Sequence, residues 1–223
     1  MSRKKPSREA AAVVTGAGSG IGRAFALELA RRGGRVVCAD INEATARDTV
    51  RMIEAAKGQA WAVACDVGEL AQVEALAARA EELLDDPVDV VVNNAGIGIG
   101  GKRIGEFDIG DWRKTVDVNL WGVIHGSRLF GRQMVAAGKR GNIVNVASAL
   151  AFAPSRMLSA YATTKAAVAM LSDCLRAELA DQGIRVTSVC PGVIDTPITG
   201  STRFVGVAEE EQARRRDGAR RLY

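Results

Sequence analysis

Histidine, aromatic residues and long apolar runs are scarce in this sequence, and each shortage excludes a class of protein. The 223-residue chain has one histidine, and its four cysteines show no CxxC spacing, so no metal site is expected. No stretch approaches the ~18 consecutive apolar residues that cross a bilayer, so no membrane span is expected. Aromatic residues make up 4% of the chain and do not interleave with a basic stripe, which argues against nucleic acid as a partner.

Positive charge is concentrated at the two ends of the chain. Residues 1–9 contribute +3 to the formal net charge of +4, and a second basic cluster lies at 214–221. Basic ends can bind nucleic acid or anionic membranes, but they are more often solvated, so we expect residues 1–10 to form a basic tail. The tail leads into only a short apolar run, which does not predict a signal peptide.

Three of the four cysteines, Cys38, Cys65 and Cys190, lie in apolar, strand-like runs. A free thiol in such a run behaves as a small hydrophobic group. Free buried thiols are typical of a reducing compartment, so the expected location is the cytoplasm.

Short apolar runs alternate with helical stretches along most of the chain. Runs rich in β-branched residues predict strands at 11–15, 35–40, 60–65, 88–92, 142–147 and 184–190. Apolar periodicity predicts helices at 21–32, 43–57, 69–85, about 108–137, and 159–182. Nearly continuous apolar strands joined by helices indicate a parallel sheet with helices on both faces. We therefore expect one α/β domain over residues 11–223, doubly wound, with ligands at the carboxyl ends of its strands.

A glycine-rich loop follows the first predicted strand and opens the first predicted helix. It reads Thr15-Gly16-Ala17-Gly18-Ser19-Gly20-Ile21-Gly22. Glycines allow a tight turn and a close approach of the backbone to a pyrophosphate, while the helix N-terminus offers N–H groups to the phosphates. The loop therefore predicts a dinucleotide site.

An acidic residue, Asp40, ends the second predicted strand, 18 residues beyond the loop. A carboxylate at this place accepts hydrogen bonds from the adenosine ribose and repels a 2′-phosphate. Neither Ile41 nor Ser19 offers a compensating cation, so we expect NAD rather than NADP. The alternative is that Asp40 only begins a turn into the next helix.

Further motifs follow in order along residues 11–200. Asn93-Asn94-Ala95-Gly96 follows the fourth predicted strand, Ser148 ends the fifth, and Tyr161 stands four residues before Lys165. With the TGxxxGxG loop and Pro191-Gly192, they resemble the short-chain dehydrogenase/reductase family, in its shorter single-domain branch. The resemblance implies a Rossmann-type fold and hydride transfer between NAD(H) and an alcohol or ketone.

The resemblance also implies which residues form the site. It assigns catalysis to Asn119, Ser148, Tyr161 and Lys165. Ser148 would bind the substrate oxygen, Lys165 would hold the nicotinamide ribose, and Asn119 would position a water that connects Lys165 to solvent. It assigns the cofactor to the following residues: Gly16, Ser19, Gly20, Ile21, Gly22, Asp40, Ile41, Asp66, Val67, Asn93, Ala95, Gly96, Tyr161, Lys165, Pro191, Gly192, Ile194 and Thr196.

The spacing of Tyr161 and Lys165 fits this chemistry, because a free phenol titrates near pH ~10 and is a weak base at neutrality. Residues four apart on a helix have Cβ atoms ~5–6 Å apart. At ~5 Å and an effective dielectric of ~20, two unit charges interact by about 3 kcal/mol, or roughly two pKa units. We therefore expect Lys165 to lower the pKa of Tyr161. His125, six residues past Asn119, is expected to point away from that residue and to be structural.

The substrate is expected to be a hydrophobic secondary alcohol or ketone. Apolar residues that should lie near Tyr161 support this expectation: Ile97, Ile99, Phe152, Pro154, Met157 and Leu158. These residues could instead pack against a partner subunit. Residues 197–210, with Gly200 and Gly206, are expected to form a mobile cover.

Several alternatives remain open from the sequence. They are an NADP-preferring carbonyl reductase, a non-catalytic dinucleotide-binding regulator, and a nucleic-acid binder acting through the basic ends. Relatives of this kind usually continue into another helix and a seventh strand, whereas this sequence stops in a charged segment at Tyr223. Either the chain is a fragment or the sheet edge is unusual. The resemblance further implies a homodimer or homotetramer formed through the helices at 108–137 and 159–182.

Overall fold

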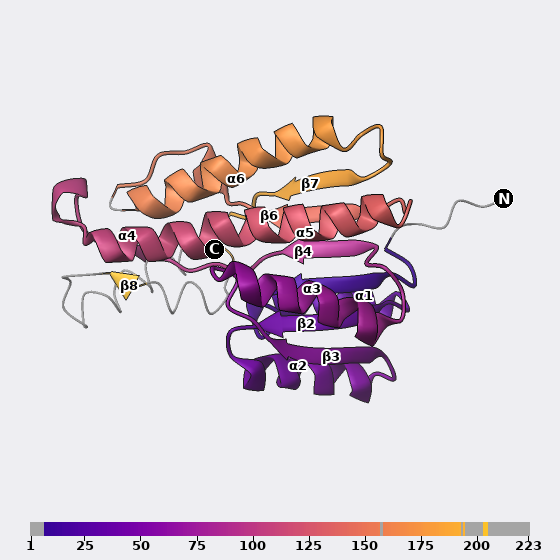
Figure 1. Ribbon diagram of the computed structural model, residues 1–223. Coiled ribbons are helices and arrows are strands. Elements are labelled where there is room, and N and C mark those ends of the chain that lie inside the picture. Colours follow the sequence, from indigo (N-terminus) through magenta and orange to yellow (C-terminus); the bar gives the residue numbers. More distant parts are fainter. Residues whose placement is uncertain (1–6, 157, 193, 195–202, 205–223) are drawn as a thin grey trace.

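The computed structural model describes residues 7–156, 158–192, 194 and 203–204. Six strands form one parallel sheet in the order β3-β2-β1-β4-β6-β7. Their bounds are β1 (Ala11–Thr15), β2 (Arg35–Asp40), β3 (Gln59–Ala64), β4 (Val90–Asn93), β6 (Asn142–Val146) and β7 (Arg185–Val189). This order, which can be followed from β7 to β3 down Figure 1, is that of a Rossmann-type doubly wound sheet.

The sheet forms because its central strands are apolar on both faces. All five residues of β1 are buried, and Val13 pairs in register with Val37 of β2 on one side and Val91 of β4 on the other. A strand covered on both faces needs no polar face, which explains the continuous apolar runs.

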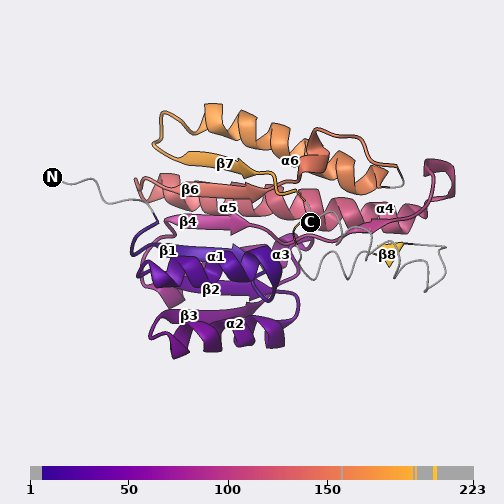
Figure 2. The same cartoon turned by 180° about the vertical axis from the view of Figure 1, so that it is seen from behind.

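Helices cover both faces of the sheet (Figures 1 and 2). Their bounds are α1 (Gly20–Arg31), α2 (Glu43–Ala55), α3 (Leu70–Leu84), α4 (Ile109–Val116), α5 (Gly122–Ala136) and α6 (Ser159–Glu178). On one face α1 and α2 bury residues such as Ala26 and Ile53 against Val36. On the other, α3 and α5 bury residues such as Leu76 and Phe130, and α6 packs beside them. This arrangement confirms the predicted fold class.

The strand order reverses between β1 and β4. From β1 the chain proceeds outward through β2 and β3, and it then returns to the other side of β1 for β4, β6 and β7. The helices that follow β1 and β4 therefore lie on opposite faces, and in open sheets of this kind the ligand crevice lies outside the carboxyl ends of two such strands.

The long helix predicted at 108–137 is interrupted in the structure. Between α4 and α5 lies one π-helical turn, Asp117–Trp121, which contains Asn119. A π turn inserts an extra residue and changes the direction of the side chains within it, often at functional sites. The apolar periodicity of the sequence did not reveal this interruption.

A second, two-stranded parallel sheet joins β5 (Ile99–Gly100) to β8 (Arg203–Phe204) beyond the carboxyl edge of the main sheet. Short 3₁₀ turns lie at Ile104–Glu106 and Ala149–Ala151. No helix of the described part of the chain is long and apolar enough to cross a membrane. Three of the expectations concern segments outside the described residues. These segments are most of the cover at 197–210, the basic cluster at 214–221, and the end of the chain, where the sequence predicts no seventh strand.

Candidate active site

The glycine-rich loop turns sharply from β1 into α1. Gly16 and Gly20 have φ angles of 62° and 51°, which strongly favour glycine. A Cβ on Gly22 would lie 2.1 Å from the carbonyl oxygen of Gly16, so the helix can approach the loop this closely only with glycine. Ser19 is the N-cap of α1 but its side chain makes no capping hydrogen bond, and the first turn carries no acid. The N-terminus of α1 can therefore bind an anion, and the loop fits a dinucleotide pyrophosphate.

Asn94 connects this loop to β4. Its Nδ2 donates to the carbonyl oxygens of Thr15 and Gly16 at 2.9 and 3.2 Å. In return, the Thr15 hydroxyl accepts from the backbone N–H groups of Asn94 and Ala95 at 3.0 and 3.1 Å. The two strands that border the crevice are thus joined at their carboxyl ends. Asn94 was not among the predicted site residues, although it lies within the recognised motif.

Asp40 lies at the carboxyl end of β2, beside the loop. Its Oδ2 accepts from the Gly18 backbone N–H at 2.9 Å, and its Oδ1 accepts from the N–H of Asn42 at 3.0 Å. Among the described residues no ion pair neutralises this carboxylate. Ile41 is 71% exposed and brings no charge. Asp40 therefore presents a negative charge at this edge of the crevice.

The segment after β3 carries Asp66 and Val67. The Oδ1 of Asp66 accepts from the Gly68 N–H at 3.0 Å, and Val67 is buried against Gly122. His125 Nδ1 lies 3.1 Å from the Val67 carbonyl oxygen, and its ring stacks on Trp121. These contacts fix α5 against the segment after β3, which is a structural role for His125.

Asn93 is the last residue of β4, and its surroundings differ from those of Asn94. The side chain of Asn93 is 2% exposed and points into the core, where its Nδ2 donates to Asn145 at 2.8 Å and Ser127 at 3.2 Å. Any contact of Asn93 with a cofactor would have to come from its backbone. Ala95 and Gly96 are half-buried and continue the chain along the crevice.

Ser148, Tyr161 and Lys165 come together beyond the carboxyl end of β6. Ser148 is 8% exposed and its hydroxyl accepts from the Leu150 N–H at 3.2 Å. Tyr161 lies in the first turn of α6, half-buried. The Lys165 Nζ lies 5.7 Å from the centroid of the Tyr161 ring and donates to the Val146 carbonyl at 2.8 Å. One helix and one strand end therefore place a hydroxyl, a phenol and an amine at one edge of the crevice.

The ionisation of this group differs from the expectation. Burial raises the pKa of Tyr161, and a hydrogen bond with the Ser148 hydroxyl offsets part of the increase. Burial also lowers the pKa of Lys165 to about 8, against a smaller opposite effect of Cys190. The prediction that Lys165 lowers the pKa of Tyr161 is therefore wrong for the protein without cofactor, because desolvation disfavours the phenolate more than the hydrogen bond stabilises it. At neutral pH the phenol is protonated.

Asn119, fully buried in the π turn, closes the other side of the group. Its amide forms a reciprocal pair with the backbone of Ile97, with Nδ2 donating at 2.9 Å and Oδ1 accepting at 2.8 Å. A Cβ on Gly96 would lie 3.3 Å from the Asn119 Oδ1 and 3.5 Å from the Lys165 Nζ. Asn119 and Lys165 thus both lie close to Gly96. Among the described residues, no hydrogen bond joins their two side chains.

The remaining predicted residues follow β7. The carbonyl oxygen of Pro191 accepts from the Ala149 N–H at 2.8 Å, which places the Pro191-Gly192 turn beside Ser148. Ile194 is 45% exposed. Thr196 lies outside the described residues, as does Met157 of the predicted substrate pocket.

The apolar residues expected to line the substrate pocket differ in exposure. Phe152 is 75% exposed, Leu158 is half-buried one turn before Tyr161, and Ile97 is half-buried while Ile99 is buried in β5. Pro154 is exposed in the same loop as Phe152.

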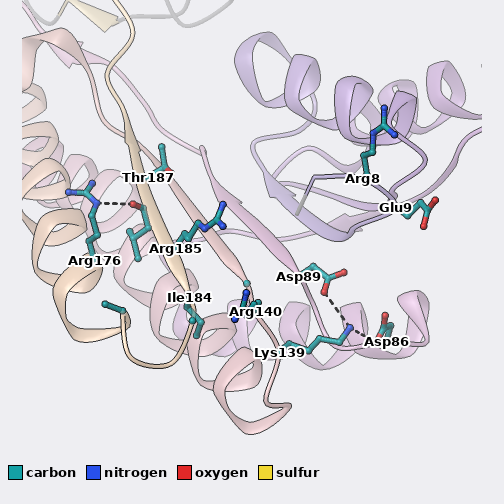
Figure 3. A pocket seen from close by; sticks show the side chains of 14 residues that line it. Arg8, Glu9, Asp86, Asp89, Lys139, Arg140, Arg176, Ile184, Arg185 and Thr187 are labelled. Carbon is teal, nitrogen blue, oxygen red and sulfur yellow. Dashed lines mark hydrogen bonds and ion pairs between the residues drawn. The ribbon is translucent and has the colours of Figure 1, made fainter. Parts of the chain in front are cut away.

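A cavity of about 910 Å³ lies elsewhere (Figure 3). Its lining includes Arg8 before β1 and Arg185 at the first residue of β7, so it opens at the amino edge of the sheet. There Lys139 forms ion pairs with Asp86 and Asp89 at 2.5 and 3.3 Å. Because no member of the Tyr161 group lines this cavity, size alone does not locate the site. Among the described residues no group of three metal-ligating side chains occurs.

The comparison with known sequences agrees with this geometry. The sequence profile of the short chain dehydrogenase family matches residues 10–204. The chain therefore belongs to the short-chain dehydrogenase/reductase family of oxidoreductases. It is 48% identical over 199 residues to the probable oxidoreductase EphD of Mycobacterium tuberculosis, a match covering 89% of this chain and 33% of that protein. The chain thus spans about one third of the length of this relative.

Two solved structures illustrate the fold and its cofactors. A short-chain dehydrogenase/reductase from Burkholderia phymatum in complex with NAD is 32% identical, with a TM-score of 0.88, and the match covers 98% of this chain and 80% of that one. A gluconate 5-dehydrogenase, described as putative and NAD(P)-dependent, from Beutenbergia cavernae with bound NADP is 37% identical, with a TM-score of 0.82 and coverage of 96% and 83%. Both of these neighbours thus hold a nicotinamide dinucleotide.

Proposed function

We propose that the chain is an NAD-preferring dehydrogenase/reductase that acts on a hydrophobic secondary alcohol or ketone, with Tyr161 as general acid and base. The observation that carries the proposal is the group formed by Ser148, Tyr161 and Lys165 at the carboxyl edge of the sheet, beside an open helix N-terminus. A nicotinamide dinucleotide would supply or accept the hydride. The loop at 16–22 would hold its phosphates, and Asp40 its adenosine ribose.

The protein's own groups account for the proton. In ketone reduction the protonated Tyr161 donates its proton to the carbonyl oxygen, and the Ser148 hydroxyl hydrogen-bonds the same oxygen as negative charge develops there. In alcohol oxidation Tyr161 must first lose its proton. Because burial raises its pKa, this direction requires positive charge nearby, and the Lys165 ammonium is the available cation. The protonated phenol is the form of Tyr161 that ketone reduction would use.

The carboxylate of Asp40 supports the preference for NAD. It carries no ion pair among the described residues, so a 2′-phosphate placed beside it would meet an uncompensated negative charge. An NADP-preferring reductase is the second candidate, favoured only by the bound NADP in the Beutenbergia cavernae structure.

The cysteine thiols support a proposal for the location of the protein, and two exposed helix residues support one for its oligomeric state. All four cysteines are free, and burial raises the pKa of Cys38 and of Cys65 to about 12, so we propose the reducing cytoplasm. We also propose a homodimer or homotetramer formed through the helices at 108–137 and 159–182, where Trp121 and Met170 are 48% and 65% exposed. We further propose a single domain that includes Ala10, which was expected in the basic tail of residues 1–10 but is 1% exposed and packs in the core.

A turnover assay tests the proposal directly. Wild type and Tyr161→Phe are compared with NADH and NADPH across apolar ketones, steroid-like ketones and small polar ketones. We expect reduction with NADH and an apolar ketone, and a loss of at least about 10³-fold in the variant at unchanged NADH affinity. Turnover confined to the small polar ketones would refute the substrate class, and full activity in Tyr161→Phe would refute the mechanism. Asn119→Ala tests the water-positioning role predicted for Asn119.

A further inference from the structure

Four successive carbonyl groups of the glycine-rich loop accept hydrogen bonds from side chains. The Asn94 side chain donates to the carbonyl oxygens of Thr15 and Gly16, as described above. The Thr49 hydroxyl of α2 donates to the carbonyl oxygen of Ala17 at 2.8 Å, and Nη2 of Arg23 in α1 donates to that of Gly18. The loop is therefore held from two sides by residues that lie outside its glycine motif.

Arg23 and Thr49 also bond to each other. The Nε of Arg23 donates to the Thr49 hydroxyl at 3.0 Å, so one guanidinium fixes Gly18 directly and Ala17 through the threonine. Thr49 is completely buried and Arg23 is half-buried. In the described part of the chain no carboxylate forms an ion pair with Arg23. Its positive charge is thus available to the loop.

Hydrogen bonds with side chains hold both the N–H and the carbonyl group of Gly18. The N–H donates to Asp40, and the carbonyl accepts from Arg23. A Cβ on Gly18 would lie 2.2 Å from the Thr45 hydroxyl, so α2 packs directly on the loop here. With its carbonyls directed toward α1 and α2, the loop leaves the N–H groups that open α1 free to bind an anion.

We propose that Arg23 and Thr49 are positioning residues for the cofactor: they hold the carbonyls of Ala17 and Gly18, and so keep the loop in the conformation that receives the dinucleotide pyrophosphate. This inference rests on the proposed function. It assigns a cofactor-related role to Thr49, which lies on a different helix from the glycine motif, 32 residues from Ala17.

Binding of NADH and backbone hydrogen exchange together test the proposal. Arg23→Met and Thr49→Val remove the contacts, and Thr49→Ser retains the hydroxyl. The matched control is Arg31→Met, because Arg31 is an exposed arginine of the same helix whose ion pair among the described residues is with Glu28. We expect Arg23→Met to raise the Kd for NADH about tenfold, which corresponds to about 1.4 kcal/mol. Thr49→Val should raise it several-fold, and Thr49→Ser and Arg31→Met should leave it within about twofold of wild type.

Two further readouts separate positioning from general stabilisation. In cofactor-free protein, the amides of residues 16–20 should exchange faster in Arg23→Met and Thr49→Val, while those of β4 and β6 remain unchanged. In turnover, the KM for NADH should rise while kcat and the KM for the ketone stay within about twofold of wild type.

Unchanged NADH affinity with unchanged exchange would overturn the proposal, and so would a uniform increase in exchange over the whole sheet. If wild type binds neither NADH nor NADPH, the proposed function fails, and the exchange of residues 16–20 still decides whether Arg23 and Thr49 hold the loop.

Discussion

Replacing Lys165 with methionine should abolish turnover and at the same time remove a pH-dependent loss of stability. The Nζ is fully buried, and burial lowers the pKa of Lys165 from 10.5 to about 8. Between these values the unfolded chain binds more protons than the folded protein, so the stability of the wild type rises with pH. Below about pH 8 the folded state bears the full cost of the buried charge, about 3 kcal/mol at 1.36 kcal/mol per pKa unit.

The measurement is the free energy of unfolding of wild type and Lys165→Met by urea at several pH values. Methionine fills the same space without a charge but leaves the Val146 carbonyl without its donor, at a cost of about 1–3 kcal/mol that is independent of pH. The wild type should therefore gain about 2 kcal/mol relative to the variant between about pH 7 and pH 9.5. A difference that does not change with pH would refute the reasoning, because it would mean that Lys165 is not desolvated.

Three other substitutions test the loop, the cofactor preference and the core. Gly22→Ala should raise the Kd for NADH by at least about tenfold in a fluorescence titration, because its Cβ would lie 2.1 Å from the Gly16 carbonyl oxygen; wild-type affinity would show that the loop can open here. Asp40→Ser should raise kcat/KM with NADPH relative to NADH by about tenfold, and an unchanged ratio would show that this carboxylate does not repel the 2′-phosphate. Phe130→Ala should cost about 3–5 kcal/mol of unfolding free energy in urea, since this side chain is fully buried between α5 and the sheet, and a loss below about 1 kcal/mol would contradict that packing.

Some of the site was readable from the sequence because it depends on local spacing. The four-residue interval between Tyr161 and Lys165 places both on one face of α6, and the glycines of the loop are required by positive φ and by close packing within a single strand–turn–helix unit. The strand runs predicted the sheet because a strand buried on both faces must be apolar throughout. Such features depend on neighbours a few residues away, which a sequence displays directly.

Other parts depended on segments that meet only in three dimensions. No local pattern indicated that Thr49 reaches Ala17, that Asn119 pairs with the backbone of Ile97, or that a π turn separates α4 from α5. It also suggested the wrong direction for the pKa of Tyr161, because the neighbouring Lys165 is visible in the sequence whereas the burial of the phenol is not. Local geometry thus determined the residue types and their intervals, and tertiary packing decided hydrogen-bond partners and desolvation, since both arise from atoms contributed by distant elements.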